Sequence, residues 1–111
     1  MERMTTAEKN ARKAKALQSL EPTVDADGRA WWAFSDICDA LKIFNRDSAR
    51  KYVPNDHART VLLRGYRYVD TRRVLMIDSV AVEQIAIYLG GRMPRAEIMA
   101  ALRRRPRSGE V

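Results

Sequence analysis

The clearest hydrophobic pattern in the chain predicts an amphipathic helix over residues 34–41. Apolar side chains recur there at the i, i+3, i+4 and i+7 spacing of one buried helix face, filled by Phe34, Ile37, Cys38 and Leu41. Ser35 is the expected N-cap, and Asp36 falls in the first turn, where the helix dipole favours an acid. One face of this helix should therefore belong to the core.

A second, shorter helix is expected between Asn45, its N-cap, and Val53, before the breaker Pro54-Asn55-Asp56. Its apolar side is predicted to dock on the first helix through Ala49, Tyr52 and Val53. The outward side then carries Arg46, Asp47, Arg50 and Lys51. This helix pair resembles the helix-turn-helix of DNA-binding proteins, whose second helix enters the major groove. Lys42 stands where glycine is usual in such a turn.

Alternating and β-branched runs predict strands over 60–63, 66–69 and 73–77, the last two forming a hairpin through residues 70–72. Asp27-Gly28 predicts an earlier hairpin between Thr23-Val24 and residues 30–33. Trp31 and Trp32 should point to opposite faces of their strand. One of them can be core, so the other must meet another element, a partner or solvent.

The flanking segments predict three more helices. Thr5 and Glu8 form a capping box in front of a basic helix with a thin apolar stripe, which could be a flexible arm or pack on a partner. Asp78 or Ser79 should cap a helix that ends at Gly90-Gly91. That helix is apolar nearly all round, as expected for a core centre or half of a dimer interface. Pro94 opens a last helix.

The predicted fold is therefore a small α+β domain with short antiparallel hairpins, a helix-turn-helix-like pair and C-terminal helices. We expect a basic N-terminal helix or arm over residues 1–20, the α+β domain over 21–102 and a basic disordered tail over 103–111. No apolar run approaches the length of a membrane span, and no secretory signal is visible. A single cysteine excludes an internal disulfide and fits the cytoplasm.

Positive charge is segregated along the chain. The 111 residues carry a net charge of +7, and residues 42–73 alone hold nine Lys and Arg against three Asp. Residues 21–41 hold five acids against one Arg. Segregated positive charge favours a surface that meets phosphate, although a face that only aids solubility is the alternative. The expected DNA-binding residues are Arg46, Arg50, Lys51, Arg64, Arg67, Arg72 and Arg73.

Those residues are expected to act in two ways. Arg46, Arg50 and Lys51 would enter the groove or hold its edges, and Arg46 or Arg50 could contact guanine. The arginines of the hairpin region would hold phosphates as a wing does. A second hypothesis is a protein-binding module, anchored by one of the tryptophans together with Tyr88. The apolar helix over residues 79–89 suggests a homodimer, which is compatible with either hypothesis. The candidate partner or homodimer interface comprises Trp31, Ile87 and Tyr88.

An enzyme is not expected. His57 is the only histidine and should be a surface loop residue, and Cys38 lies on the apolar helix face. Gly90-Gly91 lacks the context of a phosphate loop. No spacing of histidine, cysteine and carboxylates suits a metal, and no cofactor is predicted.

The stretch Ala30 to Leu41, with its Asp36-Ile37-Cys38-x-Ala40-Leu41 segment, resembles the start of the BRO-N domain of phage antirepressors. The basic helix of residues 45–53 and the run from Met76 to Leu89 are similar to later parts of that family, so the resemblance covers about Gly28 to Leu89. It implies a phage or prophage DNA-binding regulator of transcription or lysogeny, or a domain that docks on a repressor or host protein. No counterpart of the family's usual C-terminal domain is expected within these residues.

Overall fold

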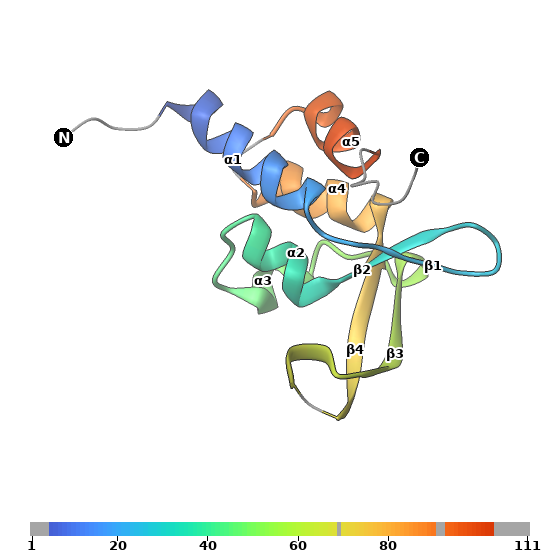
Figure 1. The fold of residues 1–111 in the computed structure, drawn as a ribbon. Helices are drawn as coiled ribbons and strands as arrows, with labels where there is room; N and C mark the ends of the chain where they lie inside the picture. The colour runs from blue at the N-terminus through green and yellow to red at the C-terminus, as the bar shows by residue number, and fades with distance from the viewer. Residues whose placement is uncertain (1–4, 69, 91–92, 104–111) are drawn as a thin grey trace.

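A computed structural model describes residues 5–68, 70–90 and 93–103 and has the predicted α+β architecture. Figure 1 shows α1, α4 and α5 gathered on one side, with the β3–β4 hairpin projecting away from them. The helices are α1 (Thr6–Gln18), α2 (Phe34–Ala40), α3 (Arg46–Arg50), α4 (Ser79–Tyr88) and α5 (Arg95–Arg103). The strands are β1 (Thr23–Val24), β2 (Ala30–Ala33), β3 (Ala58–Arg64) and β4 (Thr71–Asp78).

The four strands form one antiparallel sheet in the order β1-β2-β4-β3. The first hairpin turns as predicted at Gly28, whose φ of 83° suits glycine. The second hairpin differs from the prediction, because residues 58–64 rather than 66–69 pair with β4. Tyr66–Tyr68 is a 3₁₀ turn instead of a strand, and Val69 lies outside the described residues. Residues 66–68 have side chains that favour a strand, but they form the turn that connects β3 to β4.

Strand β4 has neighbours of unequal length. Strand β3 pairs with it along residues 71–77, whereas β2 pairs only with residues 76–78. The chain leaves β2 at Ala33 and enters α2 directly. Residues 71–75 of β4 therefore have an open edge on the β2 side within the described sheet, and this edge faces the region where α2 begins.

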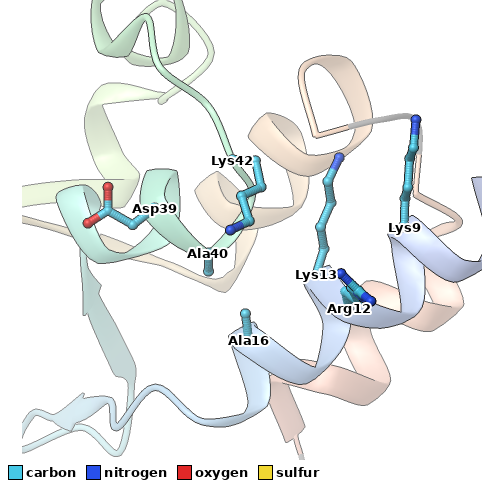
Figure 2. Close-up of a pocket in the computed structure, with 7 residues that line it drawn as sticks. All are labelled: Lys9, Arg12, Lys13, Ala16, Asp39, Ala40 and Lys42. Carbon is cyan, nitrogen blue, oxygen red and sulfur yellow. The ribbon is translucent and has the colours of Figure 1, made fainter. Parts of the chain in front are cut away.

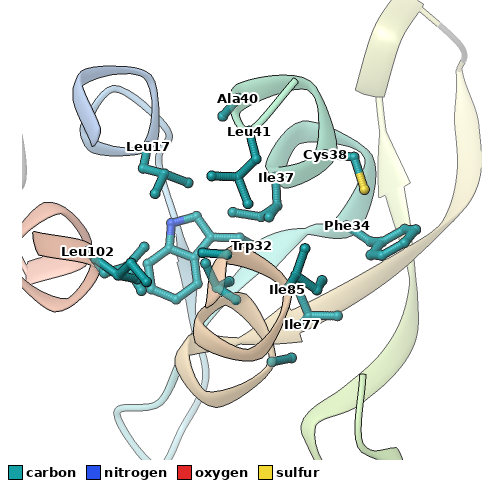
Figure 3. Packing of buried hydrophobic residues seen from close by; sticks show 14 of the residues in the cluster. Leu17, Trp32, Phe34, Ile37, Cys38, Ala40, Leu41, Ile77, Ile85 and Leu102 are labelled. Atoms are coloured by element: carbon teal, nitrogen blue, oxygen red, sulfur yellow. The ribbon is translucent and has the colours of Figure 1, made fainter. Parts of the chain in front are cut away.

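The main core lies between the helices and one face of the sheet (Figure 3). Trp32 from β2 lies amid side chains of three helices, including Leu17 of α1 and Leu102 of α5. Leu17 is 1% exposed, so α1 belongs to the core. The segment is helical as predicted, but the expectation that it lies outside the core is wrong. Its thin apolar stripe is enough to join the core because α5 covers it.

Helix α4 is the centre of this core. Its residues Ala81, Val82, Ile85 and Ala86 are fully buried. The N-cap is Asp78, whose side chain accepts hydrogen bonds from the backbone N–H groups of Val80 and Ala81 at 3.1 and 3.2 Å. The nearly all-round apolar pattern thus reflects burial within the chain on most of the helix surface. Within the described residues, only Val80 and Tyr88 of its apolar side chains are clearly exposed.

Helix α2 ends in a Schellman motif that contains a lysine where glycine is usual. The N–H of Ile43 bonds to the carbonyl of Cys38 at 2.9 Å, and that of Lys42 bonds to the carbonyl of Asp39 at 3.2 Å. Lys42 consequently has a left-handed φ of 62°. The start of α2 also differs from the prediction: Ala33 occupies the N-cap position, and the Ser35 hydroxyl serves another contact.

Replacing Lys42 with glycine should stabilise the protein by about 1 kcal/mol, because glycine adopts this φ without the clash of a Cβ atom. Urea unfolding would measure the gain. Lys9→Gly, at an exposed position inside α1, is the opposite control and should destabilise by about 1 kcal/mol. Equal losses from both substitutions would contradict the assignment of strain to residue 42.

Candidate nucleic-acid interface

The predicted helix pair exists, but its second helix is short. Asn45 caps α3 as expected, accepting a hydrogen bond from the Ser48 N–H at 3.1 Å. Ala49 and Val53 are buried and dock the segment. Tyr52 is 38% exposed and stacks on Tyr88 of α4, with ring centroids 5.2 Å apart. Helix α3 has only five residues, so it offers a groove less than two helical turns of side chains.

Arg46 does not point outward as predicted. Its guanidinium turns back onto α2, where Nη1 donates to the Ser35 hydroxyl at 3.0 Å and Nη2 donates to Asp39 at 2.8 Å. Arg50 and Lys51 are exposed and remain available to a partner. The prediction is therefore wrong for Arg46 in the unbound chain, because two acceptors on α2 lie within its reach.

Arg67 is also held by acids of α2. Its Nη2 donates to Asp36 at 3.0 Å and to Asp39 at 2.7 Å, and its Nε donates to the Tyr66 hydroxyl at 3.1 Å. The Tyr66 hydroxyl itself donates to Asp36 at 2.9 Å. Arg67 has a left-handed φ of 52°, a conformation that a non-glycine residue keeps only when its surroundings hold it.

Asp39 is the acid that both arginines share. Burial raises the pKa of its carboxyl, but the hydrogen bonds from Arg67 and Arg46 outweigh burial and bring the pKa below its ordinary value. The carboxyl is therefore ionised at neutral pH and fixes two guanidinium groups on one side of α2. Burial and the hydrogen bond to Asp36 raise the pKa of Tyr66, which stays a neutral donor.

The remaining predicted arginines lie on the β3–β4 hairpin. Arg64, Arg72 and Arg73 are all exposed. Arg72 pairs across the sheet with Leu63, and Arg73 pairs with Leu62, so the two arginines start from opposite faces of β4. No ion pair to either is present among the described residues.

Four of the predicted arginines border one small hollow, which we call the arginine hollow. It has a volume of about 150 Å³ and lies between the first turn of α2 and the open edge of β4. Its lining comprises Ser35, Arg46, Tyr66, Arg67, Arg72, Arg73, Val74 and Leu75. These four arginines were predicted from the sequence, whereas the contribution of Ser35 and the strand edge to the hollow was not.

A second, larger hollow of about 420 Å³ lies between α1 and α2, and we call it the lysine hollow (Figure 2). Figure 2 shows Ala16 and Ala40 on facing sides of it, with basic side chains around them. The lining comprises Lys9, Arg12, Lys13, Ala16, Asp39, Ala40 and Lys42. Asp39 borders this hollow and bonds to two arginines of the other, so the two basic regions are adjacent.

The basic residues of the lysine hollow were not predicted as a site, because α1 was not expected to pack against the core. The basic side of α1 was the available signal. Lys13 donates to the carbonyl of Gly90 at 2.8 Å, which ties α1 to the end of α4. Burial and the nearby Lys9 lower the pKa of this lysine.

His57 is not a surface loop residue as predicted. It is half-buried, and its Nδ1 lies 2.6 Å from an oxygen of Asp78, to which Arg29 also donates through Nε at 3.0 Å. Asp78 is 3% exposed and also caps α4. Burial raises the pKa of Asp78, but the bonds from His57 and Arg29 outweigh it and lower the pKa. The cluster joins the residue before β2, the end of β4 and the 55–57 turn.

The prediction that Trp31 belongs to a partner interface is wrong, because Trp31 is only 4% exposed. It packs in a small second core with Ala33, Val74 and Met76 on the sheet face opposite the helices. The guanidinium groups of Arg29 and Arg59 each lie over its ring, with carbons 4.8 and 4.3 Å from the ring centroid.

Of the other predicted interface residues, Ile87 is partly buried and packs against the main core. Tyr88 is 59% exposed. Of the two residues predicted on α4 for this interface, only Tyr88 is clearly exposed to a partner. Phe44, which was not predicted as a contact residue, is 93% exposed in the loop before α3.

Cys38 is fully buried, and burial raises the pKa of its thiol to about 11. We expect the native protein to react with a thiol reagent such as DTNB at neutral pH far more slowly than the unfolded protein does. Stopped-flow absorbance with and without urea would measure both rates. A native rate close to that of a free thiol would contradict the placement of Cys38 in the core.

Comparisons with known proteins add no assignment: no protein family matches the chain, and neither the curated proteins nor the solved structures gave a significant match. Across residues 5–68, 70–90 and 93–103, no group of three histidine, cysteine or acidic side chains is arranged to hold a metal. No helix in these residues is long and apolar enough to cross a membrane.

Proposed function

We propose that the protein binds DNA, mainly through contacts to backbone phosphates. The observation that carries this proposal is the arginine hollow, where four of the seven predicted DNA-binding residues converge. The adjacent lysine hollow adds Lys9, Arg12 and Lys42 to the same basic surface. Phosphate contacts supply most of the sequence-independent affinity for DNA, and they need only cations with suitable spacing.

The short second helix favours phosphate contacts over groove recognition as the main source of affinity. Helix α3 has five residues, and Arg46 is held by Ser35 and Asp39. Arg50 and Lys51 are then the side chains of the helix pair that can approach a base edge or the backbone. The β3–β4 hairpin would lie along the duplex as a wing, with Arg64 at its turn.

The resemblance to BRO-N domains supports a role for this DNA binding in the regulation of transcription or lysogeny. In that proposal the protein is encoded by a phage or prophage and acts in the cytoplasm of a bacterial host. Two-fold DNA sites would require a homodimer, and sedimentation with and without duplex would reveal one.

Fluorescence anisotropy with a labelled arbitrary duplex tests the proposal. We expect binding at low salt that weakens steeply as salt rises, with a slope of about −0.9 in log K per phosphate contacted. Replacing Arg50 and Lys51 with glutamine should reduce the magnitude of that slope by roughly 2 and weaken binding.

The matched control removes two exposed positive charges elsewhere, by Lys15→Gln and Arg103→Gln, and should change the slope much less. An equal effect of both double substitutions would mean that only net charge matters. No binding at low salt would overturn DNA binding as the function.

A protein-binding module is the second candidate, and exposed aromatic side chains favour it. Phe44 is 93% exposed, and Tyr52 and Tyr88 form an exposed stack. Aromatic residues of this kind anchor many protein interfaces. A repressor or host protein that stays bound at high salt, and is released by Phe44→Ala or Tyr88→Ala, would favour this function, because phosphate contacts do not persist at high salt.

A further inference from the structure

We propose that the arginine hollow is a binding site for one phosphate group. This inference rests on the proposed DNA binding in one respect, since a backbone phosphate is then the expected occupant. Free inorganic phosphate offers the same tetrahedral oxyanion chemistry, and duplex binding distinguishes it from a DNA backbone phosphate.

The size of the hollow suits a single small anion. Its volume of about 150 Å³ is several times the minimum that holds one water molecule. This is room for one tetrahedral oxyanion with some of its hydration. The wall is polar on most sides, because the arginines, the Ser35 hydroxyl and the Tyr66 hydroxyl all border it.

The charge at the hollow is positive in spite of two nearby acids. The lining includes four guanidinium groups and no carboxylate. Asp36 and Asp39 do not line it, and they bond to Arg67 and Arg46. Arg72 and Arg73 have no acidic partner among the described residues. The acids therefore balance two of the four charges, and an anion would meet the other two.

The two acids also hold donors in place for an anion. A guanidinium group has five N–H donors, and Arg46 uses Nη1 and Nη2 in single bonds to Ser35 and Asp39, so further N–H groups remain. Arg67 makes its bonds to protein acceptors through Nε and Nη2, which leaves Nη1 for a ligand. Guanidinium groups held in this way lose less conformational entropy on binding than mobile ones do.

The backbone contributes to the same place. Val74 and Leu75 border the hollow at the open edge of β4, where β2 no longer pairs. On the edge of an antiparallel strand, the peptide groups that point away from the partner strand are not used by the sheet. Unused N–H groups along residues 71–75 can donate to phosphate oxygens.

Inorganic phosphate is the probe, and thermal unfolding is the measurement. The reference is the melting temperature in chloride at the same ionic strength. Phosphate at tenfold its dissociation constant should raise the melting temperature by about 6 °C relative to chloride. Arg72→Gln with Arg73→Gln should abolish most of that shift, because these two arginines carry the unbalanced charge. Both side chains are exposed, so the substitutions should leave the fold intact.

Two further variants sharpen the test. Ser35→Asp places a carboxylate within reach of Arg46, where it substitutes for the anion, so phosphate should no longer raise the melting temperature. Lys15→Gln with Arg103→Gln removes the same charge from exposed positions outside the hollow and should leave the phosphate shift unchanged. A phosphate shift that is absent in the natural protein, or equally large in the Arg72/Arg73 variant, would overturn the inference.

Duplex binding separates the sources and the two proposals. If a backbone phosphate occupies the hollow, the Arg72/Arg73 variant should bind duplex at least tenfold more weakly than the natural protein. If the ligand is free phosphate, this variant should lose the phosphate shift and keep its duplex affinity. A phosphate shift in a protein that binds no duplex would support the hollow and refute DNA binding. Duplex binding without any phosphate shift would support DNA binding and refute the phosphate site in the arginine hollow.

Discussion

Replacing Ile85 with alanine is expected to lower the free energy of unfolding by about 3–4 kcal/mol. Ile85 is fully buried in α4, where it packs in the main core with Trp32, Ile37 and Ile77. The substitution removes three carbon atoms and leaves a cavity, and both effects reduce stability. A domain of this size has a total stability of about 5–15 kcal/mol, so the loss is a large fraction of it. Urea unfolding followed by tryptophan fluorescence would measure the change.

Two substitutions in the same helix calibrate that result. Ile85→Val removes one methylene-sized group and should cost about 1 kcal/mol. Val80→Ala, at a residue that is 40% exposed, should cost less than about 0.5 kcal/mol. A small effect of Ile85→Ala together with a large effect of Val80→Ala would mean that the opposite face of α4 is the buried one.

The second large effect is expected at Asp78, where alanine should cost about 2–3 kcal/mol. The loss of an N-cap accounts for about 1 kcal/mol. The rest comes from the charged hydrogen bonds to His57 and Arg29, which remain partly solvated because the Arg29 side chain is 43% exposed. Thermal or urea unfolding at neutral pH would measure the sum.

Asp78→Asn separates the two contributions. Asparagine is as good an N-cap as aspartate, so this variant should lose only the charged part. The lowered pKa of Asp78 also predicts a pH dependence. Its stabilising effect is present above the ordinary carboxyl pKa of 3.8 and is lost as the pH falls through the lower folded value. The Asn variant should lack this part of the acid destabilisation, and an unchanged acid profile would contradict the role.

Patterns of local origin were predicted well from the sequence. The capping box of α1, the caps of α3 and α4, the Gly28 turn and the apolar face of α2 all appear in the structure. Each depends on residues within a few positions of one another, so the sequence carries the whole cause. The α+β class followed from the order of these elements.

Features that depend on distant residues were predicted less well. The role of α1 was missed because the main partner of its stripe is α5, at the other end of the described chain. Trp31 was expected to be a contact residue because its neighbours Val74 and Met76 come from a strand more than forty residues later. Neither partner is visible from local periodicity.

The candidate site was predicted by residue type but not by arrangement. Segregated charge identified the arginines, yet charge alone does not show which of them pair with acids. Arg46 and Arg67 bond to acids on α2 that lie in the acidic segment 21–41. Arg72 and Arg73 come from the same basic segment and keep their charge unbalanced. Only the fold distinguishes the two pairs.

The packing of α1 against α5 has a consequence for the order in which a nascent chain can fold. Helix α1 is made first, but Leu17 has its neighbour Leu102 only after the last described helix has been synthesised. Contacts so far apart in sequence close a long loop, which slows folding. A thirteen-residue helix alone is marginal in water. During translation, α1 should therefore stay largely unstructured while the sheet and α2 form, and it should join the core last.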